Sequence, residues 1–402
     1  MRRTLMLTML VVTITLTLTG CWNRRELNDL AIALAIGIDK AGDQYMVSVQ
    51  VVDPGEVASN NRTSTRTPVT LYQAKGQTIF EAIRKMTTVS PRTIYSAHLR
   101  MLIIGEDLAK EGIGDALEYM SRYYEHRTDF YIAIARETSA ASTLKILTHL
   151  ESIPANQLFS SLQTSQKEWA PTASITLDQL IMDLVDKGKE AVVTGLRLRG
   201  DQEIGQSRSN VEQISSPAQL QYSGLAVFRE DKLVGWLNDI ESRGYSYIHD
   251  DIYNTVGVIN CPEGGKMTLE VIRSKTTTKA KMINGKPEIR LGIRTELSIG
   301  EVLCNIDLTQ KSSIYELEHQ GEARVRGFVE RTIKEAQENY KVDIFGFGDV
   351  VHRAYPAYWK QVEDEWDSIF ETIPVEVDVV FNIRQTGTVN NSFMQEFKQK
   401  KE

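Results

Sequence analysis

The sequence predicts an α+β protein of several domains, with mostly antiparallel or mixed sheets and helices packed on one face. Three observations support this fold class. The 402 residues correspond to two or three domains of about 100–200 residues each. Segments with a two-residue hydrophobic period interleave with segments of helical period. Asn284-Gly285, the strongest hairpin signal in the chain, joins two of the alternating segments.

Composition and charge exclude several classes of protein. The chain is 42% hydrophobic and 25% charged, which is typical of a folded soluble protein and not of a disordered or low-complexity one. The formal net charge is −7, whereas a nucleic-acid-binding protein shows a basic field. We therefore expect no nucleic-acid partner.

The first twenty residues have the pattern of a lipoprotein signal peptide. Arg2 and Arg3 precede an uncharged apolar segment, Thr4–Leu18, which is short for a membrane span but suits a signal-peptide core. The segment ends in Leu18-Thr19-Gly20-Cys21, which has the form of a bacterial lipobox. An ordinary signal, or an N-terminal anchor with a coincidental cysteine, is the alternative.

The lipobox predicts both a cleavage and a modification. Cleavage between Gly20 and Cys21 would leave Cys21 as an S-diacylglycerol cysteine with a free amine for N-acylation. Removing two arginines and no acidic residue changes the net charge from −7 to −9, so attachment must come from the acyl chains, which together bind a bilayer stably. The rest of the chain is then extracytoplasmic and lipid-anchored, and the covalent lipid is the only group we expect it to carry.

Residues 21–199 are predicted to form an N-terminal α+β region. A hairpin, a helix opened by the capping-box pair Thr78 and Glu81, and then alternating strands and helices are expected. Residues 137–199 contain three helical segments and a strand, and could form a separate helical subdomain. The expected elements are strands at Ala33–Asp39, Tyr45–Val52, Thr93–Ile104, Thr128–Ala135 and Glu190–Arg199, and helices at Asp107–Arg122, Ala140–Leu150, Ala155–Thr164 and Thr176–Val185.

Polar residues 200–219 are predicted to be a linker, residues 220–390 a C-terminal α+β domain, and residues 391–402 a flexible tail. In the C-terminal domain a hairpin is followed by a three-stranded meander, two amphipathic helices and a last strand. These elements are Gly224–Phe228, Lys232–Leu237, Met267–Ile272, Thr276–Ile283, Ile289–Ile299, Tyr315–Tyr340, Pro356–Phe370 and Val375–Ile383.

No motif in the sequence predicts catalysis or metal binding. The six histidines have no compact metal-ligand spacing, and there is no Gly-x-Ser-x-Gly elbow. Gly346-x-Gly348 is interpreted as a tight turn, and Asp250-Asp251 as a solvated loop. An aromatic set could be a docking surface but is more typical of a core: Phe345, Trp359, Trp366 and Phe370. We expect no enzyme, no catalytic residue, no metal and no cofactor.

Cys261 and Cys304 are the thiols that remain after lipidation of Cys21. In the predicted meander, one precedes the first strand and the other follows the third. They would lie at opposite ends of the sheet, roughly 20 Å apart at about 3.3 Å per residue, whereas a disulfide needs Cα atoms within about 7 Å. We therefore expect two free buried thiols and no disulfide.

A family resemblance begins at the lipobox. Cys21-Trp22-Asn23-Arg24-Arg25-Glu26-Leu27 is similar to the start of mature Ger(x)C proteins, the lipoprotein C subunits of spore germinant receptors, with Asn23 where many members have Asp. Further blocks resemble the family in order: His98–Ala109, Arg122 and Arg127, Gly224–Phe228, Leu233–Gly235, Glu241–Gly244, Asp343–Gly348, and then His352, Pro356, Trp359 and Trp366.

The resemblance implies a non-enzymatic subunit of a germinant receptor. It implies two integral-membrane partners, the A-type and B-type subunits, and a place on the extracytoplasmic face of the inner spore membrane. It also implies a need for this chain in the germination response to nutrients such as amino acids or sugars. A solute-binding lipoprotein of a transporter is the main alternative, and a cell-surface hydrolase is a weaker one.

Overall fold

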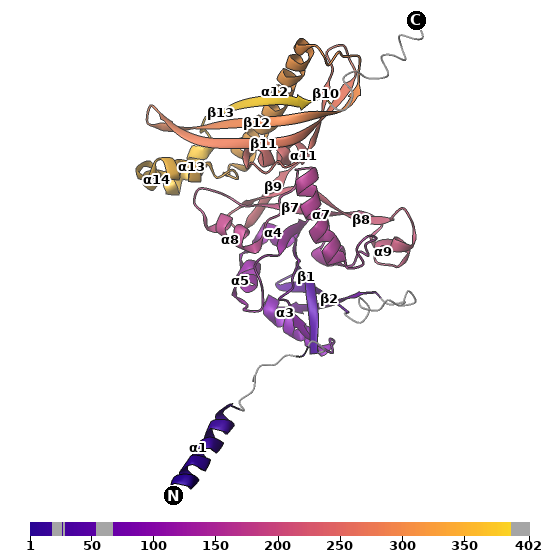
Figure 1. Cartoon of the computed structure of the whole chain (residues 1–402), viewed down its shortest axis with the longest axis vertical. Coiled ribbons are helices and arrows are strands. Elements are labelled where there is room, and N and C mark those ends of the chain that lie inside the picture. The colour runs from indigo at the N-terminus through magenta and orange to yellow at the C-terminus, as the bar shows by residue number, and fades with distance from the viewer. Residues whose placement is uncertain (18–25, 27–28, 54–66, 387–402) are drawn as a thin grey trace.

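A computed structural model describes residues 1–17, Glu26, 29–53 and 67–386 (Figure 1). The cleavage site, Cys21 and the predicted tail lie outside the described residues. Helix α1 (Arg2–Thr17) covers most of the predicted signal peptide and stands apart from the two sheets. No described helix combines the length and the apolar character that crossing a membrane requires.

The N-terminal half is built around a mixed sheet, sheet A, with the strand order β3-β2-β1-β5-β6-β7-β8-β9 and β4 beside the start of β1. Strands β1, β5, β6 and β7 are parallel, and the strands on either side of them are antiparallel. The bounds are β1 (Leu30–Ala41), β2 (Gln44–Val52), β3 (Val69–Gly76), β4 (Thr93–Tyr95), β5 (Met101–Gly105), β6 (Tyr131–Ala135), β7 (Val192–Gly200), β8 (Ala218–Arg229) and β9 (Lys232–Leu237).

Helices cover both faces of sheet A because the central strands are apolar on both sides. In β5, Leu102 and Ile104 belong to one buried cluster, whereas Met101 and Ile103 belong to the other. The first cluster is covered by α3 (Ile79–Lys85) with its 3₁₀ turn η2 (Met86–Thr88), α4 (Glu106–Glu111), α5 (Gly114–Arg122) and α8 (Leu177–Val185). The second is covered by α6 (Ala140–Leu144) and α7 (Pro154–Glu168).

The predicted linker and helical subdomain differ from the structure. Strand β7 continues to Gly200 and pairs with β8 from Ala218, so residues 200–219 connect two neighbouring strands of one sheet. This connection contains α9 (Gln202–Gly205) and α10 (Ser209–Glu212). The side chain of Asn210, fully buried, bonds to the backbone of Leu147 and Ala218. The helices of residues 137–199 pack on sheet A and form no separate unit.

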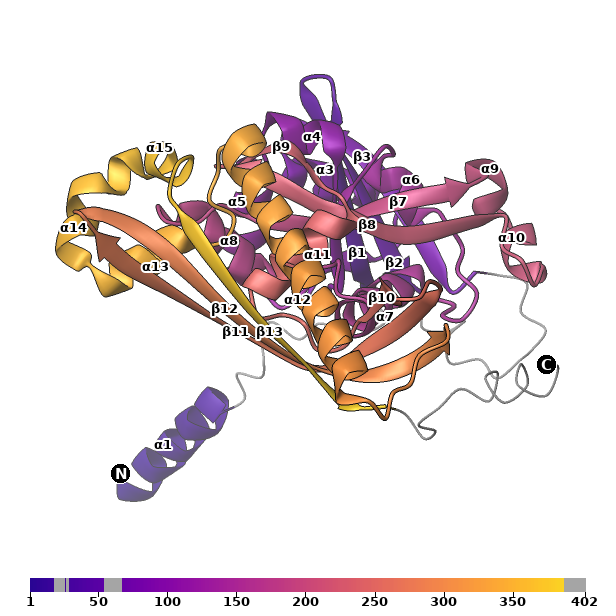
Figure 2. The same cartoon turned by 90° about the horizontal axis from the view of Figure 1, so that it is seen from above.

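The C-terminal half contains sheet B, with the order β10-β11-β12-β13. Its helices α11 and α12 lie on one face, as predicted (Figure 2). The predicted Asn284-Gly285 turn is present, with φ of 51° and 79°. The bounds are α11 (Asp239–Ile248), β10 (Val256–Asn260), β11 (Lys266–Ile283), β12 (Lys286–Leu303), α12 (Lys311–Lys334) with a π turn η3 (Glu335–Tyr340), α13 (Phe347–Ala354), α14 (Pro356–Val362), η4 (Glu363–Glu365), α15 (Trp366–Phe370) and β13 (Val375–Gln385).

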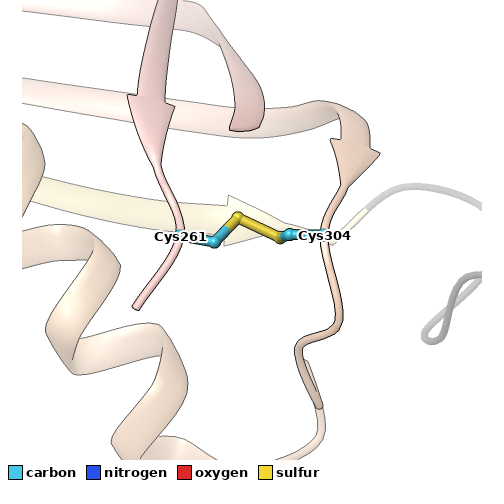
Figure 3. Close-up of a disulfide and its surroundings, with 2 residues drawn as sticks. All are labelled: Cys261 and Cys304. Atoms are coloured by element: carbon cyan, nitrogen blue, oxygen red, sulfur yellow. A yellow bond between two sulfur atoms is a disulfide. The ribbon is translucent and has the colours of Figure 1, made fainter. Parts of the chain in front are cut away.

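The prediction of two free thiols is wrong. Cys261 and Cys304 form a disulfide, with Cα atoms 6.4 Å apart (Figure 3). The predicted strands 267–272 and 276–283 are one continuous strand, β11, which passes through a bulge near Val271. The meander therefore has two long strands instead of three, and Lys266 pairs with Leu303. The chain segments that carry the two cysteines consequently meet at the same end of the hairpin.

A buried carboxylate orders the turn of the C-terminal half that contacts the N-terminal half. Asp343 accepts hydrogen bonds from the N–H groups of Phe345 and Gly348 and from the indole of Trp366, at 3.0, 2.8 and 2.9 Å. Burial raises its pKa to about 6, against the opposing effect of these donors. The backbone N–H of Glu190, from the N-terminal half, bonds to the carbonyl of Asp343. Gly346 has a φ of 72°, so the predicted tight turn is confirmed.

The aromatic set belongs to the core, in agreement with the more typical interpretation of its spacing. Phe345, Trp359, Trp366 and Phe370 are between 0% and 7% exposed and join the cluster beneath sheet B. Trp359 and Trp366 contact each other with ring centroids 5.3 Å apart. These residues therefore offer no docking surface.

Candidate functional site

The folded part of the chain begins at the amino ends of the parallel strands. Leu30 opens β1 and pairs with Thr93 of β4. It stands nine positions after Cys21, a separation that an extended chain spans in about 30 Å. The structure does not describe Gly20 and Cys21, so lipidation stays a prediction. If it occurs, the amino ends of these strands lie within that distance of the lipid.

A groove of about 690 Å³ lies at the same end. Its walls come from the first residues of β1, from the segments that lead into β5 and β6, and from the start of α7. The lining residues are Ile32, Leu34, Val52, Ala97, His98, Leu99, Arg100, Arg127, Asp129, Ile153, Asn156 and Phe159. The volume is in the range of small-molecule and peptide-anchor pockets.

The groove combines an apolar wall with a charged rim. The guanidinium of Arg100 lies 4.8 Å from the ring centroid of Phe159, and that ring stacks on Tyr131 at 4.8 Å. The backbone of Arg100 bonds to Leu34 through its N–H and accepts from Tyr131 through its carbonyl. Arg100 is thus fixed between two strands while its charge stays exposed. Such a surface suits an amphipathic or anionic group.

Two more charges complete the rim. Arg127 and Asp129 form an exposed ion pair at 2.9 Å, which contributes little to stability and remains free to exchange partners. His98 is exposed, and its ring meets that of Tyr95 edge to face, with the ring centroids 6.1 Å apart. The resemblance singled out His98, Arg100 and Arg127 without showing that they meet. Each lies within four residues before a parallel strand, β5 or β6, and that common position is the signal that could have brought them together.

The opposite, carboxyl end of the parallel strands is where open α/β sheets usually bind ligands. Here the protein fills this position itself. The carboxylate of Asp39 accepts the N–H groups of Ala140 and Ala141, both at 2.8 Å, at the start of α6. A side chain at Gly105 would collide with Asp39. Burial raises the pKa of Asp39, and the two N–H groups oppose that rise. A ligand anion would have to displace this carboxylate.

Metal ligation finds no support in the described part of the chain, where no three His, Cys, Asp or Glu residues are placed to hold an ion. His249 donates a hydrogen bond from Nε2 to the backbone carbonyl of Ile344 at 3.1 Å, and burial lowers its pKa to about 3, so it is a neutral core residue. Asp250, expected in a solvated loop, accepts the N–H of Thr276 and pairs with Lys275. It therefore caps the edge of β11.

Comparisons with known proteins identify the family. Residues 23–198 match a family described as the spore germination protein N-terminal domain, and residues 223–387 match "Spore germination B3/GerAC like, C-terminal". The chain is 33% identical to spore germination protein KC of Bacillus subtilis (strain 168), over 99% of this chain and 100% of that protein. It is 25% identical to spore germination protein B3 of the same organism, over 93% and 96% of the two chains.

A solved structure shares the fold. The crystal structure of the GerBC protein matches with a TM-score of 0.54 and 21% identity, over 90% of this chain and 100% of that one. The first family match ends at residue 198, and the second begins at residue 223. This boundary is not the boundary of sheet A, because strands β8 and β9 also belong to that sheet. By sequence over its whole length, the chain belongs to the Ger(x)C family, the family of germinant-receptor C subunits.

Proposed function

We propose that this chain is a lipid-anchored, non-enzymatic subunit of a spore germinant receptor and is needed for the germination response to nutrients. The observation that carries the proposal is the match to a spore germination protein over essentially the full length of both chains. The proposed partners are two integral-membrane subunits, of the A and B types. The proposed location is the extracytoplasmic face of the inner spore membrane.

The position of the groove supports a role beside membrane-embedded partners. A lipid on Cys21 would hold the amino ends of β1, β5 and β6 within about 30 Å of the bilayer. Tethering in the membrane plane raises the effective concentration of the chain beside its neighbours. We place the contact with a membrane subunit at the rim formed by Arg100 and Arg127, next to the apolar wall at Phe159.

The experiment replaces Cys21 with Ala in the producing cell and follows membrane retention, co-purification of neighbours and spore germination. We expect the variant to leave the membrane fraction and germination to slow or stop. A matched variant, Arg100→Ala/Arg127→Ala, keeps the lipobox and should stay in the membrane while losing its neighbours. A Cys21 variant retained in the membrane would refute the anchor. Wild-type protein that co-purifies with no membrane protein would refute the complex.

The alternative is a solute-binding lipoprotein of a transporter. The groove volume of about 690 Å³ favours it, since it can enclose a small solute. Parallel strands are also present, although they belong to one sheet and not to two lobes. The discriminating measurement is the thermal unfolding of the purified protein with panels of amino acids and sugars. A ligand that raises the melting temperature, with the rise lost in Arg100→Ala/Arg127→Ala, would support the alternative.

A further inference from the structure

A second pocket lies on the face of sheet A opposite the groove. It has a volume of about 510 Å³ and is formed by the start of β2, the start of α3 and one side of α5. Helices α3 and α5 are neighbours on this face (Figure 1), whereas α7, which forms one wall of the groove, covers the other face. We call it the aromatic pocket, after its ring-bearing residues Tyr45, Phe80, Tyr119 and Tyr123.

Three rings form one continuous wall of the aromatic pocket. The ring centroid of Phe80 lies 5.8 Å from that of Tyr119 and 5.5 Å from that of Tyr123. The two tyrosine rings, one helical turn apart, stack with their centroids 5.9 Å apart. His126 meets both tyrosines edge to face, at 5.2 Å, and its Nδ1 donates a hydrogen bond to a backbone carbonyl of α5. The tyrosines are therefore held from behind, while Phe80 is 41% exposed.

The charged groups at the aromatic pocket are mixed in sign. Asp115 accepts a hydrogen bond from the hydroxyl of Tyr45 at 3.1 Å. Glu118 and Arg122, one helical turn apart, form an ion pair. Arg84 lies over one ring of the wall, 4.8 Å from its centroid. Because these two acidic and two basic side chains cancel in charge, the pocket has no field of one sign that would select an ion, and it offers both donors and acceptors of hydrogen bonds.

Uncharged polar groups add to this set. Burial raises the pKa of Tyr45 and that of Tyr119, so both hydroxyls keep their protons at neutral pH. The side chains of Gln77 and Thr78 lie at the edge formed by the start of α3. An amide and a hydroxyl each donate and accept hydrogen bonds.

The walls of the aromatic pocket are preorganised. Asp231, in the turn between β8 and β9, fixes the start of α5, because its carbonyl accepts the N–H of Ile113 at 2.9 Å and its carboxylate that of Gly114 at 3.0 Å. The start of α3 is fixed by the N–H of Gln77, which donates to the carboxylate of Glu81 at 2.6 Å. Walls that already hold their positions lower the entropic cost of binding a ligand.

We infer that the aromatic pocket binds a saccharide. A pyranose has an apolar face of C–H groups, which packs on aromatic rings, and a rim of hydroxyls that both donate and accept hydrogen bonds. The wall at Phe80 suits that face, and the opposite charges at Asp115 and Arg122 suit neutral hydroxyls better than they suit an ion. The volume of about 510 Å³ is typical of small-molecule sites. A free sugar and the end of a glycan share this chemistry, and binding of either here does not require the proposed receptor role.

The test is saturation-transfer NMR on the purified full chain with D-glucose, N-acetyl-D-glucosamine, maltotriose and chitotriose. We expect at least one of them to bind. Phe80→Ala removes the exposed ring and should raise the Kd by about five-fold or more, whereas Phe80→Trp should retain binding. The matched control, Tyr315→Ala, removes an exposed ring of α12 and should change the Kd by less than about two-fold. No signal from any of these saccharides at about 10 mM, or equal effects of Phe80→Ala and Tyr315→Ala, would overturn the inference.

Further arms identify the source of the ligand and its site. A trisaccharide that binds about ten-fold or more tightly than its monomer would identify the end of a glycan, and similar affinities would identify a free sugar. L-Phenylalanine that displaces the saccharide would show that the pocket selects a zwitterion and would overturn the inference. Arg100→Ala/Arg127→Ala changes the groove and should leave the saccharide signal unchanged. Loss of the signal in that variant, with retention in Phe80→Ala, would place the ligand in the groove and would also overturn the inference.

Discussion

Replacing Asp343 tests whether its buried carboxylate stabilises the turn that leads into α13, beside the contact between the two halves of the protein. The side chain is 1% exposed and accepts three hydrogen bonds, two from backbone N–H groups and one from Trp366. Hydrogen bonds to a charged acceptor contribute about 1.5–3 kcal/mol each, and truncation leaves their donors buried without a partner. Burial of the charge offsets part of this gain, as the raised pKa of about 6 shows. We expect Asp343→Ala to lower the free energy of unfolding by about 3 kcal/mol at pH 7.

The pH dependence of the same variant gives a sharper test. The pKa of Asp343 is higher in the folded state, about 6 against 3.8 for the free side chain. The folded state therefore binds a proton more tightly, so the stabilisation from this group is complete below pH 4 and is lost as the pH rises to 6. The difference between the two pKa values corresponds to about 3 kcal/mol in the free energy of unfolding. The gap in stability between the wild type and Asp343→Ala should widen as the pH falls from 7 to 4.

The assay is urea unfolding followed by tryptophan fluorescence, because Trp359 and Trp366 lie in the same core. Asp378→Ala, at an exposed position of β13, is the control and should stay within about 0.5 kcal/mol of the wild type. A variant of Asp343 as stable as the wild type at pH 7, or a gap that does not change with pH, would refute the reasoning.

Other predictions concern the hairpin and the same joint. Cys261→Ser/Cys304→Ser should lower the free energy of unfolding by up to about 4 kcal/mol, since the disulfide closes a loop with a sequence separation of 43; thermal unfolding of oxidised and reduced wild type checks this independently. Gly348→Ala should destabilise the joint, because a Cβ would lie 2.5 Å from the Cα of Gly188; a melting temperature equal to that of the wild type would contradict it. Burial raises the pKa of Glu190 to about 7 in the folded state. The stability that its bound proton contributes is therefore lost as the pH rises through that value. Glu190→Gln should therefore gain stability relative to the wild type between pH 6 and 8, measured by urea unfolding at both pH values.

Local signals in the sequence were sufficient for most single elements. The alternation at Tyr45–Val52 and at Val375–Ile383 predicted β2 and β13, because successive side chains of a strand point to opposite faces. In β2 the polar positions Ser48 and Gln50 are also buried, so the alternation there does not mark an exposed face. Asn284-Gly285 predicted its turn because both residues accept positive φ. The α+β class followed from these patterns. The coverage of both faces of sheet A was harder to predict, since a short apolar run such as Met101–Gly105 has no periodicity that distinguishes its faces.

The predictions that were wrong concerned which distant segments of the chain lie side by side. A bulge near Val271 shifts the alternation in β11, and this shift suggested a strand break, which moved Cys304 to the wrong end of the sheet. Polar residues 200–219 suggested a linker because the sequence does not show that Asn210 is buried against Leu147 and Ala218. In both cases the outcome depends on which distant segments pair in three dimensions, and no local sequence pattern indicates that pairing.

The candidate groove also depends on how distant segments of the chain are arranged in space. In a sheet that binds at the carboxyl ends of its strands, the loops after the strands carry the binding residues. Here Asp39 occupies the anion position at that end, and the exposed charges precede the strands instead. A chain that enters at Leu30 brings any anchor to the amino ends of β1, β5 and β6. The direction of the parallel strands therefore places the groove at the end of sheet A where the folded chain begins, which is the end that a lipid on Cys21 would hold near the membrane.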